Sequence, residues 1–232
     1  MCNMSEPKIN TIHELLCKKS STKQDVFTKT QSIFRDLKMV MREIEAELNP
    51  KLGPNAPHVE VKYMDKGDFE AHLKFSGDTL VIMMHTNVFD FDNDHYVSKT
   101  NYVKEDPLRE FCGLIQIYNF LSDSIKYNRE HDMGYLIARI FVNKDEHFFI
   151  DGKRPLSFMF DDLSKNKISK ETLRQIIEEA MLFCLNFDLI APPTDAINYI
   201  TVEQKNMMSY SSGMPTGKLL GFTMQKNEDI IE

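Results

Sequence analysis

The sequence predicts a single α+β domain, residues 22–202, in which two amphipathic helices pack on a largely antiparallel sheet. Apolar residues recur at helical spacing in two separated segments, residues 22–49 and 169–188. Within residues 58–151 the apolar residues instead alternate with polar ones, as they do in antiparallel strands that have one face in water. Turn sequences divide this middle region into about six or seven strands. The change of hydrophobic period between the two helices therefore predicts the α+β class.

The segment before the first helix, residues 1–21, is mixed and polar, and we interpret it as a flexible leader. Weak helical periodicity is visible at four of its apolar residues, Ile9, Ile12, Leu15 and Leu16. The first helix is expected to begin at Thr22, because this hydroxyl and Asp25 three positions later suit an N-cap. It is expected to stop at Asn49, since the residue before Pro50 avoids helical angles.

The first helix carries a broad apolar stripe. Its members are Val26, Ile33, Phe34, Leu37, Val40, Met41, Ile44 and Leu48. This stripe is wider than the seam of a two-stranded coiled coil, so it favours packing of the helix on its own sheet. A dimer interface is the alternative.

Three strands are expected directly after the first helix, at residues 59–63, 69–75 and 80–84. The first two alternate, and His58 and His72 fall among their polar residues, where surface positions are expected. The third is apolar on both faces, as a central strand of a sheet would be.

The remaining strands are less uniform. A strand is expected at residues 96–103, and another at 111–121, where a helix is the alternative. Residues 135–142 and 147–150 predict a hairpin, with a turn between them. The second helix is expected to begin near Ser169. Its apolar stripe follows helical spacing throughout, at Leu173, Ile176, Ile177, Ala180, Met181, Cys184 and Leu185.

Residues 203–232 are predicted to form an extended tail, rich in glycine and methionine. Residues 213–218 resemble a phosphate-binding loop only superficially. Three residues instead of four separate its glycines, and Leu219 stands where a hydroxyl would hold magnesium. No nucleotide or other cofactor is therefore predicted.

Composition excludes several functional classes. The formal charge of −7 argues against a nucleic-acid surface and against binding to an anionic membrane. No apolar run reaches about 18 residues, so no membrane span is expected. The four cysteines are scattered without a C-x-x-C pair, which argues against a disulfide framework and a zinc knuckle. We expect a cytoplasmic protein in a reducing compartment.

One acidic segment suggests metal binding. Asp90, Asp92 and Asp94 begin like a calcium loop, in which alternate carboxylates converge on a hard cation. An EF-hand would then need glycine and glutamate where this chain has His95 and Asn101. Another arrangement remains open, in which a transition metal is held by four candidate ligands, His85, Asp90, Asp92 and His95. A solvated turn between two strands explains the same residues.

No local motif predicts a catalytic nucleophile. The G-x-S-x-G elbow is missing, and neither Cys112 nor Cys184 has a histidine and an acid beside it in the sequence. Loop carboxylates such as Asp161 and Asp162 lie where functional groups often collect, but so do ordinary polar residues. The sequence therefore assigns no catalytic residue.

Two functional hypotheses follow. The first is a non-catalytic cytoplasmic binding or regulatory protein that recognises a protein partner or itself. Its contacting parts would be the long N-terminal helix and the tail at residues 203–232. The alternative is a small-molecule-binding or hydrolytic domain with a pocket between sheet and helices. In that case strand aromatics line the pocket, with or without a metal at the acidic segment.

Overall fold

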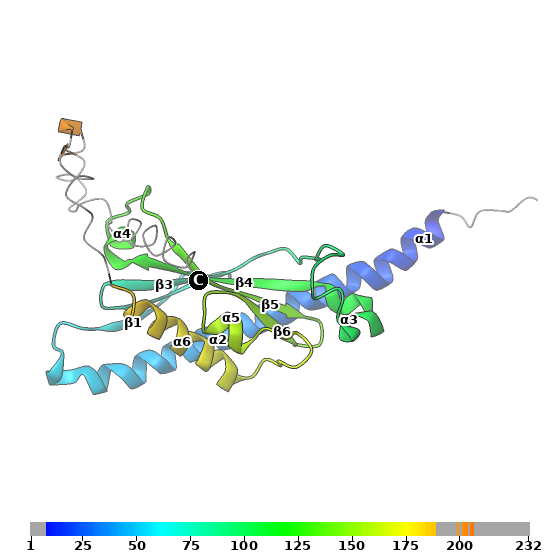
Figure 1. The fold of residues 1–232 in the computed structure, drawn as a ribbon, viewed down its shortest axis with the longest axis horizontal. Coiled ribbons are helices and arrows are strands. Elements are labelled where there is room, and N and C mark those ends of the chain that lie inside the picture. Colours follow the sequence, from blue (N-terminus) through cyan, green and yellow to red (C-terminus); the bar gives the residue numbers. More distant parts are fainter. Residues whose placement is uncertain (1–7, 189–198, 200, 204, 207–232) are drawn as a thin grey trace, which may run out of the picture.

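The computed structural model describes residues 8–188, 199, 201–203 and 205–206, and Figure 1 shows their arrangement. Six strands form one antiparallel sheet in which every strand pairs with its neighbour in the sequence. These strands are β1 (Val61–Asp65), β2 (Glu70–Phe75), β3 (Asp78–Met84), β4 (Cys112–Leu121), β5 (Tyr135–Asn143) and β6 (Phe148–Gly152). The predicted α+β fold with a largely antiparallel sheet is confirmed, including the ambiguous strand that became β4.

The N-terminal helix is longer at both ends than the sequence predicts. It consists of α1 (Lys8–Leu15), a π-helical segment η1 (Leu16–Ser20) and α2 (Ser21–Leu52). Thr22 does not cap it, because its hydroxyl donates to the carbonyl of Lys18 at 2.8 Å inside the helix. Pro50 does not stop it either. The helix has only two residues left after Pro50, so the proline disturbs little before Gly53 ends the helix with a φ of 35°.

This helix is too long for the sheet that it covers. Residues 8–52 span about 65 Å at the helical rise, whereas the 10 residues of β4 span about 33 Å. Helix α1 therefore projects beyond the end of the sheet (Figure 1). In the described part of the chain, no helix has both the length and the apolar character that crossing a membrane requires.

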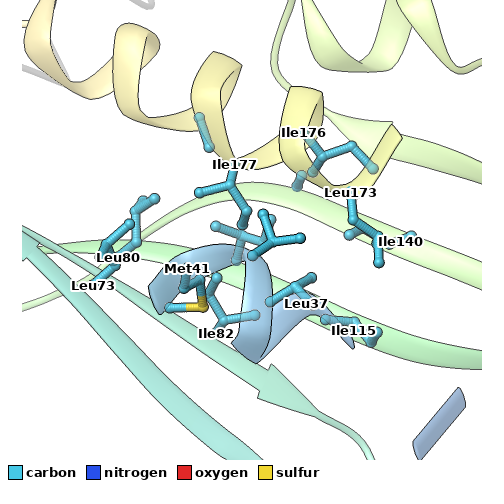
Figure 2. Packing of buried hydrophobic residues seen from close by; sticks show 14 of the residues in the cluster. Leu37, Met41, Leu73, Leu80, Ile82, Ile115, Ile140, Leu173, Ile176 and Ile177 are labelled. Atoms are coloured by element: carbon cyan, nitrogen blue, oxygen red, sulfur yellow. The ribbon is translucent and has the colours of Figure 1, made fainter. Parts of the chain in front are cut away.

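Helix α2 and helix α6 (Lys170–Leu185) cover one face of the sheet and enclose the main core with it. Figure 2 shows these side chains meeting between helix and sheet: Leu37, Met41, Leu73, Leu80, Ile82, Ile115, Ile140, Leu173, Ile176 and Ile177. The predicted start of the second helix is confirmed, since the Ser169 hydroxyl accepts from the backbone N–H of Thr172 at 3.1 Å.

The opposite face of β4 to β6 carries a second, smaller core. Its buried members are Val97, Val103, Cys112, Leu114, Phe141, Phe149 and Leu163. The long connection from β3 to β4 folds over this face and contains α3 (Asn101–Glu105) and η3 (Pro107–Glu110). The predicted strand at residues 96–103 is therefore wrong. Thr100 caps α3 there by accepting from the N–H of Val103 at 3.3 Å. The apolar residues Val97 and Val103 enter the smaller core from a loop and from α3.

His72 departs from its predicted exposed position. His72 is only 5% exposed, although it lies on the face of β2 turned away from the helices. Its cross-strand neighbours on the two sides are Met64 and Val81. The ring Nε2 is 2.6 Å from the Glu70 carboxylate, whereas Nδ1 has no hydrogen-bond partner within the described part of the chain. Alternation identified the correct face of the strand, but the side chain is buried at this position.

Burial of His72 predicts a pH dependence of stability. The pKa of His72 is lowered from 6.5, first because burial penalises the charged ring, while Glu70 acts in the opposite direction. The unfolded chain therefore binds this proton more readily, so the stability is complete above pH 6.5 and is lost as the pH falls towards the folded-state pKa. Measured by urea unfolding, the free energy of unfolding of His72→Gln should fall less between about pH 8 and about pH 5 than that of the original chain. Parallel curves for the two proteins would contradict this origin.

Candidate functional site

The four candidate metal ligands lie after β3, in the connection to β4, and are not assembled into a site. His85 Nδ1 accepts from the N–H of Asn87 at 3.0 Å, and His95 Nδ1 accepts from the N–H of Val97 at 3.3 Å. The Asp90 carboxylate accepts from the next residue's N–H, and the Asp92 carbonyl accepts from the N–H of His95. Among the described residues, no three His, Cys, Asp or Glu side chains are placed to hold a metal ion. Local backbone N–H groups orient the side chains of His85, Asp90 and His95, and the His95 ring stacks on Phe91 with centroids 4.6 Å apart.

Between the sheet and the helices, the described residues pack as the main core. Three aromatic residues from β2, β6 and the segment after α5 (Leu156–Met159) are buried in this core: Phe75, Phe148 and Phe160. Cys112 is completely buried, and burial raises the pKa of its thiol, which keeps it protonated and unsuited to nucleophilic attack.

A hollow of about 850 Å³ opens instead on the other face of the sheet. Three segments line it: residues 95–102 of the connection before β4, residues 149–151 of β6, and residues 157–165, which run from α5 into the segment after it. The third segment is held to the edge of β6, because the N–H of Ile150 donates to the carbonyl of Phe160 at 2.7 Å. We call this feature the acidic hollow.

Aromatic rings form part of its wall. Tyr96 is 48% exposed and its ring meets the buried ring of Phe149 edge-on, with centroids 5.7 Å apart. The Tyr96 hydroxyl donates to the carbonyl of Asp161 at 3.1 Å, which ties the loop to the segment beside β6. Burial, followed by the nearby carboxylates, raises the pKa of Tyr96, so this hydroxyl stays a donor.

The charge of the hollow is negative. Its lining holds three carboxylates, Asp151, Asp161 and Asp162, against one ammonium, Lys165. The hydrogen bonds from Lys165 and Ser164 lower the pKa of Asp162 to about 2, so it is ionised at any physiological pH. Asp151 pairs with Arg139. Within the described residues, the exposed carboxylate of Asp161 makes no hydrogen bond or close ion pair, although its charge, after that of Asp162, helps to raise the pKa of Lys165.

The second candidate is the projecting helix itself. Four large apolar side chains are exposed on α1 and at the start of η1: Ile9 at 66%, Ile12 at 51%, Leu15 at 54% and Leu16 at 58%. Neither α1 nor η1 contains a buried residue. The base of this helix is fixed, because the ammonium groups of Lys19 and Lys23 lie 5.2 and 4.7 Å from the ring centroid of Phe111.

The sequence pointed to parts of these two features but not to their assembly. Tyr96 lies 65 residues before the adjacent pair Asp161 and Asp162, and only the fold brings them to one hollow. The predicted tail at residues 203–232 lies outside the described residues except for 203, 205 and 206. Comparison of the chain with protein-family models, with curated proteins and with solved structures gives no match.

Proposed function

We propose that the chain is a non-catalytic binding protein that acts through protein–protein contacts made by α1 and η1. The observation that carries this proposal is the row of exposed apolar side chains on a helix that projects from the body. Ile9, Ile12 and Leu16 follow the i, i+3, i+7 spacing with which an amphipathic helix enters an apolar groove. Contiguous exposed apolar surface of this kind commonly marks an interaction site.

The helix is prepared for binding before its partner arrives. A helix as short as α1 would be marginal on its own in water, since forming the first turn is unfavourable. Here the helix is continuous with α2, whose inner side is buried against the sheet. The partner therefore meets an ordered helix, and less conformational entropy is lost on association.

We also propose a cytoplasmic location for the chain. Cys17, Cys112 and Cys184 are free thiols, and Cys17 is exposed. Exposed free thiols are maintained most easily in a reducing compartment, which supports this location.

Photo-crosslinking from α1 tests the proposal. A photoreactive residue at the exposed position of Thr11, in the full chain, is expected to give a crosslinked protein product in purified protein or in cell extract. The variant Ile12→Lys/Leu16→Lys should lose that product, because it places two ammonium groups where apolar anchors are buried in the complex.

A matched control separates α1 from general surface effects. Met39→Lys/Leu182→Lys changes two apolar side chains that are each 51% exposed, on α2 and α6, and should keep the product. The proposal is abandoned if Thr11 gives no crosslinked protein in either sample. It is equally abandoned if the control variant loses the product to the same extent.

A further inference from the structure

We infer that the partner of α1 is a second copy of this chain, and that α1 of each copy docks at the acidic hollow of the other. The inference rests on the function proposed above, because it names the partner and the receiving surface for the same helix. Three observations carry it: the charge of the helix, the charge and rings of the hollow, and the position of both.

The helix is a basic element on an acidic protein. Residues 8–19 contain three lysines, Lys8, Lys18 and Lys19, and one acid, Glu14, whereas the whole chain carries −7. Glu14 already pairs with Lys18 at 2.7 Å. Two copies of such a protein repel each other in most orientations, and attraction is restricted to those that place this helix against an acidic surface.

The acidic hollow offers the chemistry that this helix lacks. The exposed carboxylate of Asp161, which accepts no hydrogen bond from the described residues, can accept a charge-assisted hydrogen bond from a lysine ammonium. The half-exposed ring of Tyr96 offers an apolar surface for Ile12 or Leu16, and a face for a cation. Apolar anchors bordered by lysines thus meet an aromatic wall bordered by carboxylates.

The two features lie at the same end of the molecule, yet α1 cannot reach its own hollow. Lys19 and Lys23 lie over Phe111, the residue directly after η3, so α1 emerges beside the connection that lines the hollow. From there α1 runs away from the body in continuity with α2 (Figure 1). Reciprocal docking around a two-fold axis at this end gives a closed dimer with two identical contacts.

Sedimentation equilibrium of the full chain tests the receiving surface. The hollow variant Asn101→Lys/Asp161→Lys changes two exposed lining residues and leaves Asp162 in place to hold Ser164. It is expected to weaken the dimer by about tenfold or more, because two added ammonium groups repel the helix lysines. The control variant Asn55→Lys/Asp68→Lys makes the same substitutions at exposed positions outside the hollow lining and should stay within about twofold.

Crosslink mapping gives a second readout that does not depend on the variants folding. An isotope-labelled copy is mixed with a copy that carries the photoreactive residue at Thr11, and crosslinks between the two are mapped. Crosslinks to residues 95–102 or 157–165 of the labelled copy support the inference.

Four outcomes overturn it. Crosslinks from Thr11 to α1 of the labelled copy leave α1 as a contact helix but remove the hollow as its receptor. Equal dimerisation of the hollow and control variants likewise removes the hollow as the receptor. A chain that stays monomeric removes the second copy as the partner. Binding of phosphatidylserine vesicles through α1 would then identify a membrane surface as the partner instead. If Thr11 crosslinks a different protein in extract, the proposed function survives and this inference does not.

Discussion

Replacing Phe34 with alanine is expected to lower the free energy of unfolding by about 3–5 kcal/mol, because it empties a ring-sized volume in the main core. Phe34 is fully buried on α2, among the side chains that join the helix to the sheet. The Lys38 ammonium lies 5.2 Å from the centroid of the ring, so the variant also loses this contact. Urea unfolding followed by circular dichroism measures the difference.

Met39→Ala on the same helix is the control for this prediction. Met39 is 51% exposed, so its removal should change the free energy of unfolding by no more than about 0.5 kcal/mol. If Phe34→Ala were as mild as this control, α2 would not be packed on the sheet as described. The contact helix α1 would then lose the support that keeps it ordered.

The parts of the fold that the sequence predicted are those in which one residue type repeats against one neighbouring surface. The stripe from Val26 to Ile44 faces the sheet, and the stripe from Leu173 to Cys184 faces the same core. Alternation in β1 and β2 and the hairpin of β5 and β6 were likewise readable. In each case the buried surface is continuous along the element, so the period survives in the sequence.

The connection between β3 and β4 could not be read in this way. Val97 and Val103 are buried, which looks like strand alternation, but Val97 lies in a loop and Val103 on the short helix α3. The direction of a side chain in such a loop depends on local hydrogen bonds. His85 and His95 therefore turn towards backbone N–H groups rather than towards a shared metal. Spacing in the sequence carries no record of that choice.

The acidic hollow was hidden for a different reason. Its carboxylates come from β6 and from the segment after α5, and its exposed ring comes from a loop more than 50 residues earlier. Each residue is ordinary in its own segment. The projecting helix, in contrast, left a weak signal, because the four apolar residues between Ile9 and Leu16 were already visible as a helical pattern.

Gly113→Ala is expected to destabilise the protein by about 1–3 kcal/mol, because α2 crosses β4 too closely for a side chain. A Cβ atom at Gly113 would lie 2.1 Å from Thr30 Oγ1 and 2.8 Å from Thr30 Cβ. Thr30 is fully buried, and its hydroxyl donates to the carbonyl of Val26 at 2.7 Å, so it cannot turn away freely. Helix and strand must separate to admit the methyl group.

Thr30→Ala tests whether this contact is the cause. The single change removes Oγ1 and Cγ2, the first and third closest atoms, at a cost of about 1 kcal/mol for the lost hydrogen bond. The double variant should then lose less stability than the sum of the two single losses. The coupling is expected to be about 1 kcal/mol or more in thermal or urea unfolding. Strict additivity would show that the strain at Gly113 arises elsewhere. Coupling would establish the close crossing that fixes α2 on the sheet and therefore sets the direction in which α1 leaves it.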